Sequence, residues 1–409
     1  MTVTEKILAK ASKKAVVFPG EIVKAKVDKA MIHDNNAPLV MKHFSKIVVD
    51  QVWDPERIVF VVDHHSPCTS IKAAQHQAEM REFARKQGVK KFFDCGEGIC
   101  HVLMLEKGLA GPGQVIVGTD SHTTGEGALG SFATGIGATE MAGVLATGEI
   151  WLRVPETIKV EINGDIPSGS DARDVISLVL QKIGASGANY LAVEFTGTTV
   201  EKMDLSEKTT LCVMSMEMGA KNAVIVPAEG KNTGDHLESD PDAGYYAHLV
   251  FDVADLEPLV ACPSLPTNIR KVEEVEKDRI FINQAAVSSC AGAQLRDLKA
   301  AAEILKNKKI AENVRLLVIP ASREIYNQAM HEGYLNILHD AGAIISSPAC
   351  GACGAHDIGA LAPGEVCISS TTRNMPGRMG PGGEIYLASA ATVAASALKG
   401  YICDPRKVV

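Results

Sequence analysis

The feature that most constrains the fold is the alternation of short apolar runs with longer amphipathic segments. The apolar runs are bounded by turn residues and predict buried strands, while the segments between them have the patterning of helices. Buried strands that alternate with helices are typical of α/β layers with mostly parallel sheets. The expected strands are 58–63, 114–120, 157–164, 222–228, 314–321 and 343–349, and the expected helices are 69–88, 171–184, 323–342 and 389–398.

Two breaks in this pattern predict three α/β domains. The first lies near residue 155, where an apolar segment leads into a new strand. The second lies near residue 278, after the charged stretch 271–279. The predicted domains are therefore residues 1–155, 156–278 and 279–409.

Charge and composition exclude several kinds of partner. The 409 residues include 41 Lys and Arg against 49 Asp and Glu, a net charge of −8, without a basic run. This balance argues against nucleic acid as the main partner. No segment approaches the roughly 18 apolar residues of a membrane span. The first residues also lack the apolar core of a signal peptide. We therefore expect a cytoplasmic protein with no membrane partner.

The cysteines carry the strongest local signal. Cys350 and Cys353 lie on a Gly/Ala turn after an expected strand, and Cys290 ends another strand and opens a second glycine turn. Three readings compete at this point. They are a thioredoxin-like dithiol, for which no matching unit is visible, a zinc site that recruits His356, and an iron–sulfur cluster. Spacing alone does not choose between zinc and iron–sulfur.

Three short segments place acids beside histidines at the ends of strands or at turns. They contain Asp63 and His64, then His101, then Asp120 with His122. A carboxylate that hydrogen-bonds an imidazole fixes its tautomer and raises its pKa, which suits general acid catalysis near neutrality. A lone histidine is more often structural, but three such segments together with three cysteines favour an active site.

Two further motifs need an interpretation. Arg373 and Arg378 flank a turn, and such a pair could bind a di- or tricarboxylate, although two surface arginines are the default reading. The run Gly125 to Gly130 fits the G-x-G-x-x-G pattern of dinucleotide-binding proteins. Five residues separate it from the preceding strand, and no suitably spaced acidic strand end follows, so we give this pattern little weight.

Taken together, these residues resemble the aconitase family. The stretch from Gly118 through Asp120-Ser121-His122 to Gly130, continuing to Glu140, is similar to the family signature nearly residue for residue. The resemblance covers essentially the whole chain and is closest to the branch of the family that acts on isopropylmalate. It implies three α/β domains of the aconitase type around a central [4Fe–4S] cluster with one open iron.

The resemblance also implies a role for individual residues. The open iron would act as a Lewis acid on the substrate, and Asp63 and His64 would form the acid pair that protonates the leaving hydroxyl. Asp120 with His101 and Glu217 with His122 would be two supporting pairs. The expected cluster ligands are Cys290, Cys350 and Cys353, and the expected substrate-binding residues are Ser121, Arg373 and Arg378. His33 falls near a substrate-facing position.

In the family, the base that removes the carbon-bound proton lies on a fourth, swivelling domain, which we do not expect on this chain. The resemblance therefore implies a heterodimer, in which a separate small subunit carries that domain and this chain alone is inactive. The expected activity is that of a hydro-lyase on a 2-hydroxy dicarboxylate, with 2-isopropylmalate and 3-isopropylmalate first, as in leucine biosynthesis. The alternatives are a homoaconitase-like activity, a dehydratase for dimethylmalate or citramalate, an RNA-binding regulator without cluster, and a zinc-stabilised scaffold.

The chain departs from the family pattern at two places. Ala291 and Gly292 follow the first cysteine where the family usually has Thr and Asn. Thr372 and Met375 stand where it usually has Asn and Phe. These changes remove polar groups expected to face the cluster, and such groups tune a metal site.

Overall fold

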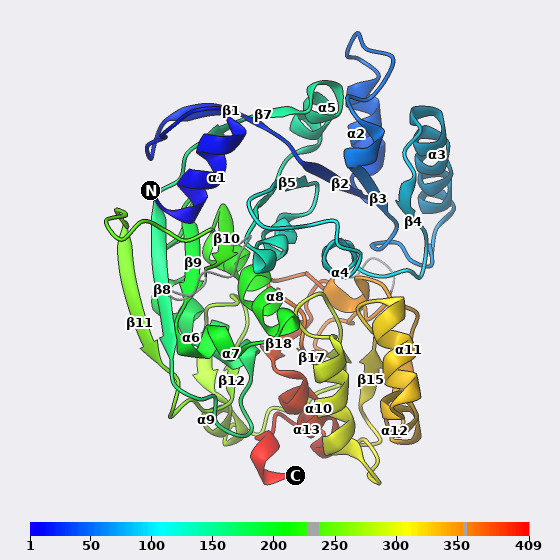
Figure 1. Cartoon of the computed structure of the whole chain (residues 1–409). Coiled ribbons are helices and arrows are strands. Elements are labelled where there is room, and N and C mark those ends of the chain that lie inside the picture. The colour runs from blue at the N-terminus through cyan, green and yellow to red at the C-terminus, as the bar shows by residue number, and fades with distance from the viewer. Residues whose placement is uncertain (227–236, 355–357, 409) are drawn as a thin grey trace.

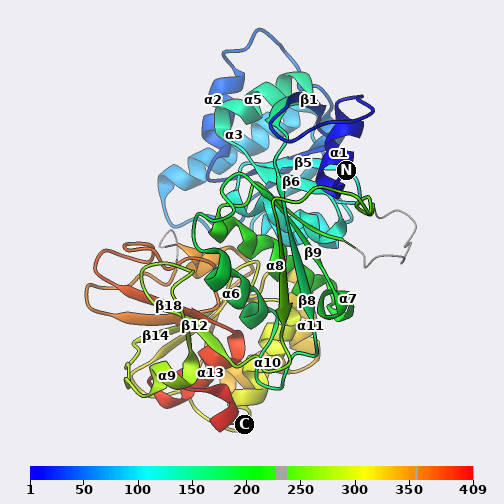
Figure 2. The same cartoon turned by 90° about the vertical axis from the view of Figure 1, so that its left-hand side faces the viewer.

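The computed structural model describes residues 1–226, 237–354 and 358–408, and these form three groups of strands, each with its own helices (Figure 1). The group from the N-terminal third lies above the other two in both views (Figure 2). No helix in the described part of the chain is long and apolar enough to cross a membrane.

The first group is built on a five-stranded parallel sheet of order β4-β3-β2-β5-β6, beside an antiparallel ribbon of β1 and β7. All four residues of β3 and of β5 are buried, as expected for parallel strands covered on both faces. The strands are β1 (Ile22–Lys26), β2 (Lys29–His33), β3 (Ile58–Val61), β4 (Lys91–Phe93), β5 (Val115–Gly118), β6 (Phe132–Gly135) and β7 (Glu149–Arg153). The helices are α1 (Val3–Ala11), α2 (Ala37–Phe44), α3 (Ile71–Gln87), α4 (Cys100–Glu106) and α5 (Ala138–Thr147), with 3₁₀ turns η1 (Pro55–Arg57) and η2 (Ser121–Leu129).

The second group has a four-stranded parallel sheet of order β10-β9-β8-β11. Its strands are β8 (Thr157–Asn163), β9 (Ala192–Thr196), β10 (Asn222–Ile225) and β11 (Ala247–Asp252). Its helices are α6 (Ala172–Ile183), α7 (Thr198–Lys202) and α8 (Leu205–Met214), followed by η3 (Ser215–Met218).

The third group has a seven-stranded sheet of order β13-β12-β18-β17-β14-β15-β16, in which only the β12 pairings are antiparallel. Its strands are β12 (Leu259–Ala261), β13 (Ile269–Lys271), β14 (Gln284–Val287), β15 (Arg315–Val318), β16 (Ile344–Ile345), β17 (Val366–Ser369) and β18 (Glu384–Ala388). Its helices are α9 (Val272–Glu276), α10 (Leu295–Leu305), α11 (Arg323–His331), α12 (Tyr334–Asp340) and α13 (Ala390–Lys399), with η4 (Gly351–Cys353) and η5 (Pro405–Lys407).

The α/β class expected from the sequence is confirmed. The division into three domains stays a prediction. The sheets change between β7 and β8, beside the expected boundary at 155, whereas β12 and β13 precede residue 278 yet pair within the third sheet.

One expected helix, 323–342, is wrong as a single element. It is interrupted between α11 and α12 at Gly333, which adopts a left-handed φ of 81°. A residue with positive φ cannot continue a right-handed helix, so the amphipathic pattern on both sides of Gly333 belongs to two helices.

The glycine run 125–130 serves packing rather than phosphate binding. Gly125 and Gly127 belong to η2, and a Cβ on Gly127 would lie 1.7 Å from the carbonyl oxygen of Ala223 in β10. η2 approaches β10 of the second sheet so closely at this point that a side chain does not fit.

Gly127→Ala is therefore expected to lower the free energy of unfolding by roughly 1–3 kcal/mol, the usual cost of overpacking. Gly143→Ala is the matched control, because a Cβ at Gly143 in α5 meets no atom within 4 Å and alanine favours a helix. Urea denaturation of both variants checks the prediction, which an unchanged midpoint for Gly127→Ala would contradict.

Candidate active site

The site begins where the strands of the first sheet end. β2 ends at His33, Asp63 and His64 follow β3, and Asp120 follows β5. The carboxyl ends of parallel strands share one edge of a sheet, and functional groups gather at that edge. This is why segments far apart in the sequence converge here.

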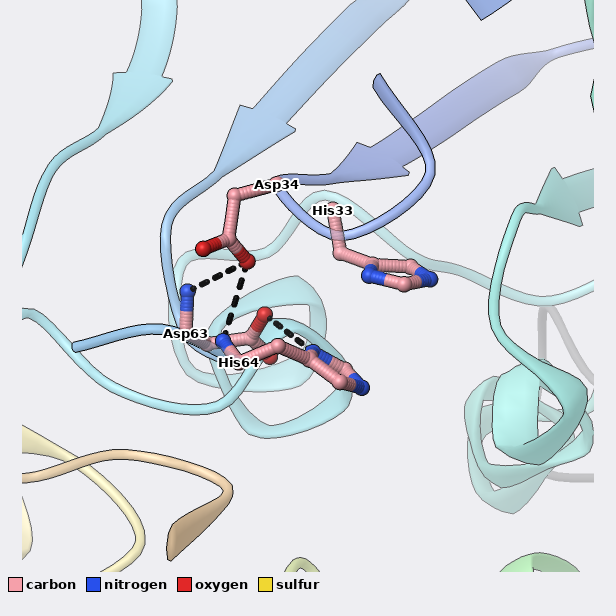
Figure 3. Close-up of side chains that lie close together, drawn as sticks. All are labelled: His33, Asp34, Asp63 and His64. Carbon is pink, nitrogen blue, oxygen red and sulfur yellow. Dashed lines mark hydrogen bonds and ion pairs between the residues drawn. The ribbon is translucent and has the colours of Figure 1, made fainter. Parts of the chain in front are cut away.

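A buried carboxylate, Asp34, holds the segment after β3 in place (Figure 3). Its Oδ1 accepts hydrogen bonds from the backbone N–H groups of Asp63 at 3.3 Å and His64 at 3.0 Å. The Asp63 side chain then bridges His64 Nδ1 at 2.8 Å and the backbone N–H of Cys100 at 2.8 Å. The His33 ring stacks on His64 with centroids 4.1 Å apart.

These four side chains also have the composition of a small metal site, since one donor atom from each lies within 4.8 Å of the others. Their hydrogen bonds favour another reading. Both Asp34 oxygens accept backbone N–H groups, and both Asp63 oxygens have partners. The group therefore acts as a frame that fixes Nδ1 of His64 and leaves Nε2 pointing away from Asp63.

A chain of acids and imidazoles continues from His64. Its Nε2 lies 3.4 Å from Asp120 Oδ2, and Asp120 Oδ1 lies 2.9 Å from Nε2 of His101. On the far side of His101, Nδ1 lies 3.2 Å from Oε1 of Glu126. Carboxylates and histidines thus alternate from Asp63 to Glu126.

A second branch brings in the other two groups of strands. His122 Nε2 lies 2.8 Å from Oε1 of Glu217, which belongs to η3. The same oxygen accepts a hydrogen bond from Nε of Arg373 at 2.8 Å. Nη2 of Arg373 donates to Oγ of Ser121 at 2.9 Å. Residues of all three groups therefore meet in one network.

The network sets the charges of its histidines. Burial alone would lower the pKa of His64, but the charge of Asp63 and the hydrogen bonds of Asp120 and Asp63 outweigh it and raise the pKa well above its ordinary value. Burial and the charge of His64 lower the pKa of His33 to about 4. At neutral pH one ring of the stacked pair is therefore protonated and the other is neutral.

The three candidate ligand cysteines lie at the edge of the third sheet. Cys290 follows β14 and is buried, as is Cys353 in η4, while Cys350 is partly buried. The backbone N–H of Cys350 donates to the carbonyl of Asp63 at 2.9 Å, which places this turn against the acid–histidine chain. The hydrogen bond from Cys350 lowers the pKa of Cys353, against the effect of burial, and the charge of Arg378 lowers it further. His356, considered as a zinc ligand, lies outside the described residues.

Two of the residues that depart from the family pattern, Thr372 and Gly292, make close contacts beside the cysteines. The hydroxyl of Thr372 lies 3.5 Å from the sulfur of Cys353 and so supplies a polar contact to it. A Cβ on Gly292 would lie 2.2 Å from the carbonyl oxygen of Ser370, so the cysteine loop and the arginine-bearing segment touch at this glycine. Arg173 holds the same segment through the carbonyls of Ser370 at 3.0 Å and Thr371 at 2.5 Å.

The structure thus brings the sequence-predicted site residues to one place. Asp34, Glu126 and Arg173 were not assigned a role from the sequence. Of these, Glu126 had the one available signal, because it is the only charged residue between Gly125 and Gly130. Arg173 lies at an ordinary helix start, and nothing in the sequence around it indicated a role.

One cavity lies beside this network and a second lies apart from it. A cavity of about 410 Å³ borders Asp120 and Ser121 and reaches Lys221. A larger one of about 750 Å³ is lined by residues of α8 and α10 and by the segment that precedes α6. Its Arg296 forms an ion pair with Glu207 at 2.5 Å.

The fold and the site define the class of protein. The chain belongs to the aconitase family, whose sequence model, described as aconitase family (aconitate hydratase), matches residues 5–400. It is 48% identical to the 3-isopropylmalate dehydratase large subunit 1 of Methanopyrus kandleri, over 99% of both chains. It is 46% identical to the probable methanogen homoaconitase large subunit of Methanothermobacter thermautotrophicus, over 100% of this chain and 98% of that one. It is 45% identical to the 3-isopropylmalate dehydratase large subunit 1 of Pyrococcus furiosus, over 100% of this chain and 99% of that one.

Proposed function

We propose that this chain is the large subunit of a hydro-lyase that interconverts 2-isopropylmalate and 3-isopropylmalate by removing and re-adding water. The observation that carries the proposal is the continuous acid–histidine network beside three cysteines. The names of the relatives support the substrate, and a homoaconitase-like activity is the second candidate because one relative carries that name. Dimethylmalate and citramalate are further candidate substrates.

His64 is proposed as the acid that protonates the leaving hydroxyl. Nδ1 of His64 is occupied by Asp63 at 2.8 Å, so the proton available to a substrate is the one on Nε2. In the dehydration, the C–O bond breaks and the hydroxide leaves as water with that proton. A base removes a proton from the neighbouring carbon, and the C–H electron pair forms the double bond.

The other residues of the network are proposed to bind and orient. His101 keeps Asp120 ionised beside His64, and His122 is held by Glu217. Ser121, Arg373 and Arg378 are proposed to bind substrate carboxylates, because guanidinium groups match carboxylate geometry. Glu217 holds Arg373 at Nε and Ser121 contacts it at Nη2, which fixes the orientation of the guanidinium group.

Cys290, Cys350 and Cys353 are proposed to hold a [4Fe–4S] cluster with one open iron. Three thiols form a soft donor set that suits iron–sulfur or zinc. The hydroxyl of Thr372 at 3.5 Å and Nη2 of Arg378 at 3.9 Å from the sulfur of Cys353 favour a thiolate, as a cluster ligand requires. When bound, such a cluster supplies a Lewis acid for the hydroxyl and carboxylate of the substrate.

A small subunit is proposed to complete the enzyme. The relatives are named large subunits, which supports a smaller partner for this chain. We propose that the partner carries the swivelling domain with the base that removes the carbon-bound proton. The domains 1–155, 156–278 and 279–409 would then surround the cluster on this chain, which we place in the cytoplasm.

The test is a metal analysis and a substrate panel on protein purified without oxygen together with its small subunit. We expect to find iron and acid-labile sulfide. We also expect kcat/KM to be higher with the isopropylmalates than with homocitrate, dimethylmalate or citramalate. A preference for homocitrate would select the second candidate. Zinc without sulfide, and no turnover of any of these acids, would overturn the proposal in favour of a zinc scaffold.

A further inference from the structure

Glu126 is a buried carboxylate that the proposed mechanism does not use. Its side chain is fully buried in η2, with Oε1 3.2 Å from Nδ1 of His101. Its other oxygen, Oε2, is buried and has no hydrogen-bond partner among the described residues. A carboxylate in such a place is costly unless it is paired with a charge. Among the described residues, the one hydrogen-bond partner of its carboxylate is the ring of His101.

His101 is held between two carboxylates. Nε2 lies 2.9 Å from Asp120 Oδ1, and Nδ1 faces Glu126. Ionised carboxylate oxygens only accept hydrogen bonds, so an imidazole that satisfies both carries a proton on both nitrogens. Without Glu126 the imidazole no longer requires a proton on Nδ1, and without Asp120 it no longer requires one on Nε2.

We propose that Glu126 is a positioning residue, which holds His101 doubly protonated so that Asp120 stays ionised and directs its second oxygen to Nε2 of His64. This inference rests on the proposed function, because it assigns a purpose to His64. Glu126 itself does not touch the reacting groups. It acts through His101 and Asp120, the two residues that lie between it and the proposed acid.

The groups around this pair support the assignment. Besides Asp120, the ring of His122 faces His101 with centroids 6.3 Å apart. Thiols of two other segments lie within electrostatic range of Glu126. They belong to Cys100 and Cys212, and burial raises the pKa of each, which keeps both groups neutral.

The pKa of His101 agrees with double protonation. Burial alone would lower it, but the charge of Glu126 and the hydrogen bonds of Asp120 and Glu126 raise it to about 10. Burial raises the pKa of Glu126, and the charge of His101 opposes that effect. The charge on each member of the pair therefore depends on the other.

The test is Glu126→Gln, which keeps the shape and removes the charge. The amide can donate to Nδ1, so His101 then needs one proton only, on Nε2. The measurement is a pH titration by NMR of the full chain, labelled at histidine with ¹³C and ¹⁵N. In the parent we expect His101 to stay doubly protonated through neutral pH. In Glu126→Gln we expect its pKa to fall toward the ordinary value of about 6.5. A His101→Asn variant assigns the signal.

The kinetic expectation concerns the complex with the small subunit. Loss of a group that orients a catalytic residue typically costs about 10- to 100-fold, and we expect this loss in kcat with KM little changed. The rate should also fall on the alkaline side at a lower pH than in the parent, because His101 now loses its proton there.

Glu194→Gln is the matched control. Glu194 is equally buried but lies in β9, where Ser239 and Tyr245 donate to it, outside the site. It should leave the His101 signal and the pH profile unchanged. An unaltered His101 titration in Glu126→Gln would overturn the inference, as would an unaltered kcat. If the parent complex turns over none of the hydroxy acids, the proposed function fails, and the titration still decides whether Glu126 holds the second proton.

Discussion

Cys353→Ser is expected to remove both the cluster and catalysis. The sulfur of Cys353 is placed to be a thiolate, because the hydrogen bond from Cys350 and the charge of Arg378 lower its pKa even though it is buried. A serine hydroxyl has a far higher pKa and is a hard ligand, so it does not replace a soft thiolate on iron. Iron and acid-labile sulfide per chain should fall to background, and turnover with them.

Cys367→Ser is the control for this prediction. Cys367 is buried in β17 of the same sheet, and its sulfur lies 3.8 Å from the side-chain amide of Gln284. We expect this variant to keep its iron and sulfide. A Cys353→Ser protein with the iron and sulfide content of the parent would show that Cys353 is not a ligand.

His64→Ala is expected to keep the cluster and lose turnover. General acid catalysis typically contributes about 10²- to 10⁴-fold, and we expect kcat to fall by an amount in this range. The histidine frame is not part of the thiol set, so metal and sulfide should be unchanged. The pKa of His64 is raised in the folded protein, so its acid form persists above neutral pH and is lost as the pH rises through that value. In the parent, the rate of dehydration should therefore fall on the alkaline side.

His248→Ala is the matched control. His248 lies on β11, where its Nε2 is 3.0 Å from Glu161 and nearly half of its side chain is exposed. It should leave both the rate and the metal content unchanged. A His64→Ala protein that keeps full activity would contradict the proposed acid. One that loses its iron would assign His64 to the metal centre instead.

Much of the site could be predicted because its residues follow strands directly. Asp63, His64, Asp120 and His122 each lie within a few residues of a buried apolar run, and such runs end at one edge of a parallel sheet. Glu217 was different. It follows a helix, and its place beside His122 came from the resemblance to the family rather than from any local pattern.

The features that could not be predicted from the sequence depend on contacts between distant segments. Glu126 sits in a glycine run that fits a dinucleotide-binding pattern, and the close approach of Val213 to Gly125 and of β10 to Gly127 explains two of those glycines. Arg173 begins a helix and becomes informative only when it meets the carbonyls of Ser370 and Thr371. Local patterning carries no information about such tertiary contacts.

The link between Glu217, His122 and Arg373 also bears on how the protein matures. Glu217 is 95 residues from His122 and 156 residues from Arg373, so the link closes only after distant parts of the chain have docked. Contacts of such long range form late, because the entropy of closing long loops must be overcome first. During synthesis, Cys290 emerges well before Cys350 and Cys353. Assembly of the proposed cluster on these three cysteines would therefore follow the docking of the segments that carry them.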